Sequence, residues 1–178
     1  MNARHFMLLL LLALAMPAIA QEHAHSPYVG EQERTIASLS DQEITAYRTG
    51  RGMGLAKAAE LNHYPGPRHV LDLAEELELT DAQRAEVRAA REAMRSKAIP
   101  LGKQIVAKEA ALDALFADGQ ATPDTVRALL HEIAVLKADL RFAHLNAHLT
   151  MQDALTEQQI RRYDVLRGYA SEAEHPGH

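Results

Sequence analysis

Apolar residues recur at steps of three and four over two long segments, which is the period of an amphipathic α-helix. The first segment runs from Asp81 to about Ala117 and the second from Pro123 to about Ala154. Asp118-Gly119 ends the first and Thr122-Pro123 begins the second, so only a short turn separates them. The pattern predicts an antiparallel hairpin of two long helices. At Pro100 we expect a kink and not a stop, because the apolar period continues beyond it.

The second long helix carries apolar residues on two faces. One face holds Leu129, Ile133, Leu136, Leu140, Ala143, Ala147 and Met151, and the roughly opposite face holds Val135, Phe142, Leu145 and Leu149. The other helix of the hairpin can cover only one of these faces. We therefore expect a shorter helix or a second subunit to cover the other.

Helix-start signals predict shorter helices around this hairpin. Ser40 and Glu43 can form a capping box, and Gly50 is placed to end the helix that they begin. Short helices are also expected at about 55–61 and 70–77, separated by the proline-containing stretch 63–69. With a last helix from Thr156 to about Arg167, the predicted fold class is all-α, a long kinked antiparallel helical hairpin with shorter flanking helices.

The two ends of the chain differ from this helical body. Residues 1–20 combine a short basic start, an apolar run and a final Ala-Ile-Ala, which is typical of a cleaved secretory signal peptide. The apolar run is short beside the about 20 residues of a membrane span, so no retained membrane anchor is expected. We expect mobile tails at 21–30 and 171–178. Between them, residues 31–62 form a helical extension and residues 63–170 the main helical domain.

The composition excludes several functions. The chain has no cysteine, so no disulfide and no thiolate nucleophile or thiolate metal ligand can form. Its net charge is −5, which gives no support to nucleic-acid binding.

One motif occurs twice, on either side of the hairpin. Leu79-Thr80-Asp81-Ala82-Gln83 opens the first long helix and Leu155-Thr156-Glu157-Gln158-Gln159 opens the last helix, each with a Thr and a Gln that can form a capping box. With the hairpin and the signal peptide, these motifs resemble the LTxxQ family of periplasmic proteins, which includes Spy/CpxP-type stress chaperones and periplasmic heavy-metal sensor and resistance proteins. The resemblance covers about residues 70–169. It implies a bent four-helix arrangement that usually dimerises, a periplasmic location and no enzymatic activity.

Histidines near the end of the second long helix are candidate metal ligands. His144 and His148 lie four residues apart on one helix face, and Met151 follows them. Such a pair can share a Zn, Cu or Ni ion, with His69 as a further ligand. Alternatively, the two histidines cover the seam of the hairpin and Met151 belongs to the core. The cobalt/nickel sensor branch of the family has a His-x3-His pair before the first long helix and a His-x3-Met before the second motif. Here the former is missing and Ala147 replaces the histidine of the latter, so that site is not carried over intact.

A basic stripe follows the first long helix and consists of Arg84, Arg88, Arg91 and Arg95. In an antiparallel hairpin this stripe lies near the histidine turn, where it disfavours an added cation and attracts acidic segments of other proteins. The alternative is a solvated face whose arginines pair with nearby glutamates.

These observations lead to three hypotheses. The leading one is a periplasmic Spy/CpxP-like stress-response accessory protein, a homodimer that binds unfolded or envelope signalling proteins without ATP through the basic stripe and apolar patches. The second is a periplasmic heavy-metal sensor or resistance protein centred on His144 and His148. The third is an inert helical hairpin whose motifs serve folding alone.

Overall fold

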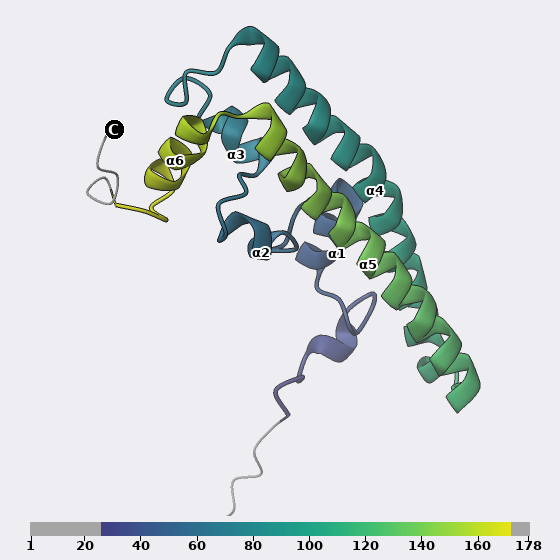
Figure 1. Ribbon diagram of the computed structural model, residues 1–178. Coiled ribbons are helices and arrows are strands. Elements are labelled where there is room, and N and C mark those ends of the chain that lie inside the picture. Colours follow the sequence, from purple (N-terminus) through teal and green to yellow (C-terminus); the bar gives the residue numbers. More distant parts are fainter. Residues whose placement is uncertain (1–25, 172–178) are drawn as a thin grey trace, which may run out of the picture.

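The computed structural model describes residues 26–171, so the predicted signal peptide, most of the first tail and residues 172–178 lie outside it. The regular elements of the described residues are all helices, with no strand, apart from one isolated β-bridge between Ile36 and Leu39. A 3₁₀ turn, η1 (Glu31–Glu33), precedes α1 (Asp41–Thr49), α2 (Lys57–Glu60), α3 (Pro67–Asp72), α4 (Asp81–Ala117), α5 (Pro123–Ala154) and α6 (Glu157–Leu166). Figure 1 shows α4 and α5 as a long antiparallel hairpin, with α3 and α6 at its open end and the joined ends extending beyond α1. The predicted all-α hairpin fold is confirmed, and α3 to α6 make up its four-helix part.

Most predicted helix bounds are close to the observed ones. Both long helices have the predicted limits, and α4 continues through Pro100. The helix expected at 70–77 is wrong at both ends, since α3 begins at Pro67 and ends at Asp72. Pro67 occupies the first helical turn, where its fixed φ is favourable and its missing N–H is not needed. Residues 73–78 form turns, and Glu78 there has a left-handed φ of 51°. α2 is also shorter than expected.

Each helix-start signal makes the hydrogen bonds that its sequence predicts. The cap side chains of Ser40, Thr80 and Thr156 accept from the amide three residues later, and the Glu or Gln at that position accepts from the cap amide. Thr122 caps α5 in the same way, with Thr125 as its partner. Each cap of this kind contributes on the order of 1 kcal/mol, so the helix starts are fixed locally.

The two glutamines of the repeated motif are hydrogen-bonded to each other. Gln83 Nε2 donates to Gln159 Oε1 at 2.8 Å, and Gln159 Nε2 donates to Gln83 Oε1 at 3.1 Å. Their amide nitrogens also donate to the carbonyl oxygens of Ala154 and Leu77, respectively. Each glutamine therefore caps its own helix with its oxygen and joins the other helix start with its nitrogen. The motif occurs twice because its two copies together tie α4 to α6.

The apolar core is divided along the hairpin. The largest cluster lies at the open end, where α3, α4, α5 and α6 meet: Val70, Ala74, Leu77, Leu79, Val87, Met151, Ala154, Leu155 and Tyr163. A second cluster, of Ile36, Leu39, Ile44 and Val106, joins the start of the described chain and α1 to α4. A third, of Ala98, Ile105 and Leu140, lies within the hairpin. The extension is thus held by its own apolar contacts.

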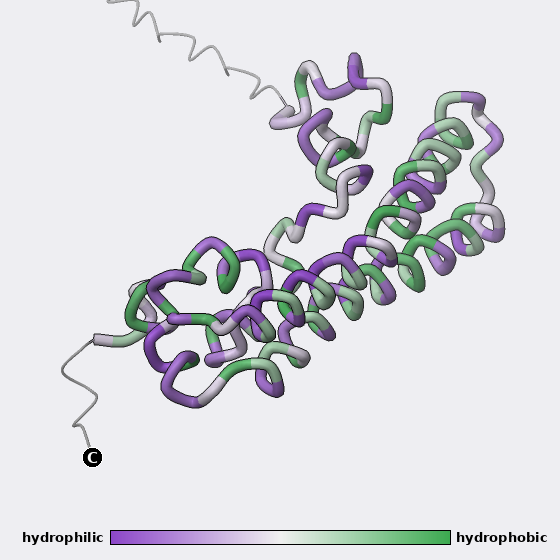
Figure 2. Tube along the Cα trace, turned by 90° about the horizontal axis from the view of Figure 1, so that it is seen from above, coloured by the Kyte–Doolittle hydropathy of each residue, from purple (hydrophilic) through white to green (hydrophobic). Residues whose placement is uncertain are grey.

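A glycine allows α1 to lie directly on α4. A Cβ atom at Gly102 would lie 2.0 Å from the carbonyl oxygen of Tyr47, far inside van der Waals contact. α4 therefore keeps the glycine despite its low helix propensity. Figure 2 shows the N-terminal segment to one side of the hairpin, whose long helices alternate between polar and apolar residues.

The second apolar face of α5 is largely uncovered. Val135, Phe142 and Leu149 are exposed, and Leu145 is half-buried. Within residues 26–171 no shorter helix covers this face, which leaves the expected second subunit as a prediction.

Candidate functional site

Two hollows adjoin the seam between α4 and α5. One is a groove of about 710 Å³ between the two long helices. The other is a cavity of about 1160 Å³ between the hairpin and residues 42–72 of the extension and α3. Met94 and Ala147 line both hollows and so form the wall between them. The hairpin thus offers two candidate surfaces of different chemistry.

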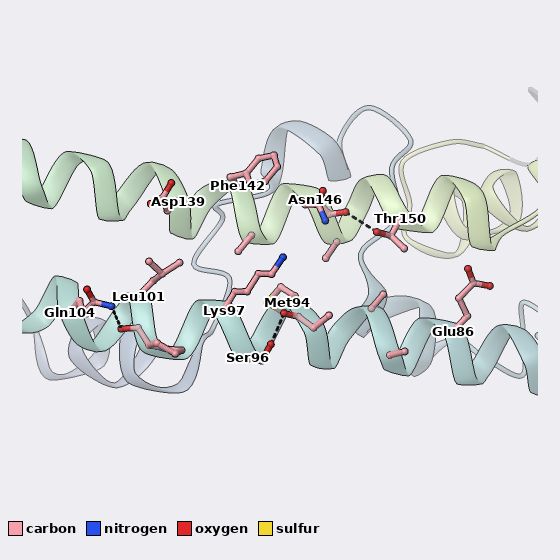
Figure 3. Close-up of a pocket in the computed structure, with 16 residues that line it drawn as sticks. Glu86, Met94, Ser96, Lys97, Leu101, Gln104, Asp139, Phe142, Asn146 and Thr150 are labelled. Atoms are coloured by element: carbon pink, nitrogen blue, oxygen red, sulfur yellow. Dashed lines mark hydrogen bonds between the residues drawn. The ribbon is translucent and has the colours of Figure 1, made fainter.

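The groove is mostly apolar and is lined by small side chains. Its floor consists of Ala89, Ala90, Ala93, Met94, Leu101, Ala143 and Ala147. Figure 3 shows Lys97 of α4 pointing toward α5, and the ring of Phe142 on the side of α5 that faces away from α4. Glu86, Asp139, Asn146 and Thr150 also line the groove. The side chain of Phe142 is 62% exposed. A groove of this kind can accept apolar side chains of another chain without any change in the hairpin.

The cavity brings together residues that the sequence predicted for different roles. His69, His144 and His148 line it together with Arg91 and Arg95. The candidate metal ligands and half of the basic stripe therefore share one space. This arrangement depends on the extension, which supplies the opposite wall.

The remaining predicted site residues lie elsewhere. Met151 is fully buried in the core cluster at the open end. Arg84 donates to the carbonyl oxygens of Leu79 and Ala74 and pairs with Glu75, so it holds the turn before α4. Arg88 is exposed and does not line the cavity. The four arginines share a helix face, but their surroundings differ.

His144 is the most buried of the three histidines. Its exposed fraction is 5%, and its Nε2 atom has no hydrogen-bond partner among the described residues. Gly52 lies beside the ring, since a Cβ there would be 3.8 Å from Nδ1. Burial, and then the nearby His148, lowers the pKa of His144. The imidazole is therefore neutral at pH 7 and available to a ligand as a donor or an acceptor.

His148 is held in one orientation. Its Nδ1 lies 2.8 Å from the carbonyl oxygen of Tyr64, and a carbonyl only accepts, so Nδ1 carries the proton. In the neutral ring Nε2 is then the acceptor. His69 stands farther along the cavity, with Nδ1 3.7 Å from Asp72 Oδ2, and burial lowers its pKa. His144 and His148 thus each have a ring nitrogen that no described residue binds.

A nearly buried carboxylate, Glu60, joins α2 to the end of the chain. Glu60 Oε1 accepts from Tyr163 Oη at 2.5 Å and from Tyr169 Oη at 3.2 Å, and it lies 3.4 Å from Arg167 Nε. Burial and the bond to Glu60 raise the pKa of Tyr163 above its ordinary range. This cluster could not be predicted from the sequence, because no local spacing relates residue 60 to residues 163–169. Only the packing of the extension brings them together.

No group of three or more His, Asp or Glu side chains within residues 26–171 is arranged to hold a metal ion. Glu60, 3.7 Å from His148 Nδ1, is already bound by two tyrosines and an arginine. Metal binding by His144, His148, Met151 and His69 therefore stays a prediction.

A family model described as "LTXXQ motif family protein" matches residues 67–167, more than half of the chain. The chain belongs to the LTXXQ motif family. The matched range contains both motifs and helices α3 to α6, whereas α1 and α2 precede it. Proteins of this family are in general periplasmic or secreted, Spy/CpxP-like and without enzymatic activity. Membership thus agrees with the resemblance drawn from the two motifs.

No curated protein and no solved structure matched the chain. Within the part that the structure describes, no helix combines the length and apolar character of a membrane span.

Proposed function

We propose that this protein is a Spy/CpxP-like stress-response accessory protein of the periplasm, which binds unfolded or envelope signalling proteins without ATP. The observation that carries the proposal is the apolar groove between α4 and α5, whose lining includes the exposed Phe142. Its floor belongs to the family-matched part of the chain. Small side chains leave room for apolar groups of many shapes, which suits a protein that holds unrelated unfolded segments.

Charge around the groove favours weak and reversible binding. Lys97, Glu86 and Asp139 line it, so both signs stand near an inserted apolar group. Arg88 lies exposed on the same helix and can attract acidic segments at longer range. Binding by apolar contacts and by these charges requires no conformational change driven by nucleotide.

A matched pair of phenylalanine variants tests the groove. Phe142 and Phe116 are almost equally exposed, at 62% and 61%, but only Phe142 lines the groove. In an assay of thermal aggregation of a model client, Phe142→Ser is expected to weaken suppression several-fold and Phe116→Ser to leave it unchanged. Equal losses in the two variants, or no suppression by the wild-type protein, would refute the proposal.

Metal binding is a second candidate function. His144 and His148 line one cavity, and the hydrogen bond of His148 Nδ1 to a carbonyl oxygen leaves its Nε2 for a metal ion. Titration with Zn²⁺, Cu²⁺ and Ni²⁺ is expected to show binding that the His144→Ala/His148→Ala variant loses. Equal binding by both proteins would assign any metal to other histidines.

A homodimer is supported by the exposed face of α5. Val135 and Leu149 are both exposed and lie two steps of seven apart, the spacing with which one helix packs along another. Sedimentation equilibrium is expected to give a dimer that Val135→Glu/Leu149→Glu dissociates. A monomeric wild-type protein would contradict this assignment.

A further inference from the structure

The cavity under the extension is cationic although the chain as a whole is acidic. Its lining contains six permanently basic side chains, namely Arg51, Lys57, Arg68, Arg91, Arg95 and Arg167, and three acidic ones, namely Glu43, Glu60 and Asp72. The chain has a net charge of −5. The fold therefore places an excess of positive side chains around this cavity, although the whole chain has a negative net charge.

Three of the six basic groups already have partners. Arg167 lies beside Glu60, Arg68 pairs with Asp72, and Arg95 Nη1 donates to the carbonyl oxygen of Thr49. The side chains of the other three, Arg51, Lys57 and Arg91, form no hydrogen bond or ion pair with any residue in 26–171. Uncompensated guanidinium groups that face a shared space attract an anion, and arginine binds carboxylates with two parallel hydrogen bonds.

The same cavity offers apolar contacts. Met53 and Leu61 are exposed large apolar residues in its lining, and Leu55, Leu71 and Met94 stand farther in. His144, almost fully buried, contributes an imidazole with no partner among the described residues. A ligand that satisfies this lining carries negative charge next to apolar groups.

We propose that the cavity binds an acidic peptide segment in which apolar side chains stand beside the carboxylates. The volume of about 1160 Å³ exceeds the about 300–1,000 Å³ typical of small-molecule sites and suits a short length of chain. This inference rests on the proposed function, because an unfolded protein supplies such a segment. It assigns the charge recognition to a second surface, half of which lies before the family-matched range.

Arginines one turn apart on α4 give a matched test. Arg91 lines the cavity and Arg88 does not. In calorimetry with a short peptide of alternating Leu and Glu, the purified protein is expected to bind, and Arg51→Gln/Arg91→Gln to bind about tenfold or more weakly. Arg88→Gln is expected to bind as the wild type does, and a peptide of alternating Leu and Gln is expected not to bind.

Several results would overturn the proposal. An equal loss in Arg88→Gln would mean attraction to general surface charge, and equal binding of the Gln peptide would mean that carboxylates are not recognised. Binding of inorganic phosphate alone, with displacement of the peptide, would mean a site for small oxyanions. Absence of peptide binding to the wild-type protein would also refute it. Unchanged thermal unfolding of each variant serves as the check on folding.

The two proposals can fail separately. Phe142→Ser is expected to lose aggregation suppression and keep peptide binding, because Phe142 lines only the groove. Arg51→Gln/Arg91→Gln is expected to lose peptide binding and keep suppression of a client that lacks acidic segments. Loss of both activities in both variants would mean a single surface and would contradict the separate cavity site.

Discussion

The groove and the cavity adjoin the same two helices and share two lining residues, Met94 and Ala147, yet their chemistry differs. The groove is made by α4 and α5 alone, and alanines make up much of its apolar lining, with Glu86, Lys97 and Asp139 beside them. The cavity is made by several segments and carries long charged ones. On one side the hairpin is bare, and on the other residues 42–72 stand over it. The difference shows that a segment packed against a helical hairpin, here residues 42–72, can create a polar site there while the hairpin itself stays the same.

The side of the hairpin that residues 42–72 cover depends on more specific side-chain contacts than the uncovered side. Glu60 is only 13% exposed and is held by Tyr163, Tyr169 and Arg167. A nearly buried carboxylate needs such partners, because its loss of hydration is otherwise costly. The groove contains no comparable network, so its shape depends only on the packing of two helices. Variants that disturb the extension should therefore weaken binding in the cavity and leave binding in the groove unchanged.

The variant Gly102→Ala is expected to cause the largest difference between binding in the cavity and binding in the groove. Helix propensity alone predicts a gain of about 1 kcal/mol from replacing a helical glycine by alanine. The Cβ would lie 2.0 Å from the Tyr47 carbonyl oxygen, so α1 must move away from α4. We expect a net loss of about 1–3 kcal/mol, as for overpacked cores, in urea-induced unfolding. Peptide binding in the cavity should fall, and aggregation suppression by the groove should remain.

An exposed position on α4 provides the control for Gly102→Ala. Lys103→Ala changes the neighbouring residue, which is exposed, and should alter stability by a few tenths of a kcal/mol. A Gly102→Ala protein that is more stable than the wild type would show that α1 does not lie on α4 as described.

A smaller effect is expected from Tyr163→Phe, which removes a buried hydroxyl that is bonded to Glu60 of the cavity lining. Tyr163 Oη donates to Glu60 and accepts from the amide of Gly66 at 3.4 Å, in a fully buried position. The expected cost is about 1–2 kcal/mol, because the Gly66 amide loses its partner while Glu60 keeps Tyr169 and Arg167. Tyr169→Phe removes the longer bond from a half-buried ring and should cost less, below about 1 kcal/mol. Equal costs in thermal unfolding would contradict the central place of Tyr163.

Local signals in the sequence were sufficient to predict the helices, but not to predict how the helices pack together. The long helices and their caps follow from periodicity and from hydrogen bonds within four residues, so they could be predicted. The periodicity also placed four arginines on one face of α4. It could not show that Arg84 would donate hydrogen bonds to carbonyl oxygens of the preceding turn, or that Arg91 and the extension would line one cavity. Those outcomes depend on contacts between residues far apart in the chain.

The bond between Gln83 and Gln159 illustrates the same limit. Each glutamine was predicted to close a capping box, and each does. Their side-chain amides can meet only because α5 returns to the start of α4. The predicted hairpin implies this return, but not the exact positions of the two side chains. Likewise His144 and His148 were correctly placed on one face, but the carboxylate beside them comes from α2.

The smallest predicted effect concerns the pH dependence contributed by His144, the buried histidine on the side of the hairpin that the extension covers. Burial lowers the pKa of His144 in the folded protein below its ordinary value, so the unfolded chain binds the proton more readily. Stability is therefore lost as the pH falls through the ordinary histidine range, from about pH 7.5 to about pH 5.5. His144→Gln should reduce this pH dependence in urea-induced unfolding, whereas His131→Gln, at an exposed position of the same helix, should not. His69, whose pKa is also lowered by burial, keeps its contribution in both variants. An identical pH slope in wild type and His144→Gln would mean that water or a bound group reaches the ring, and that the extension does not close over it.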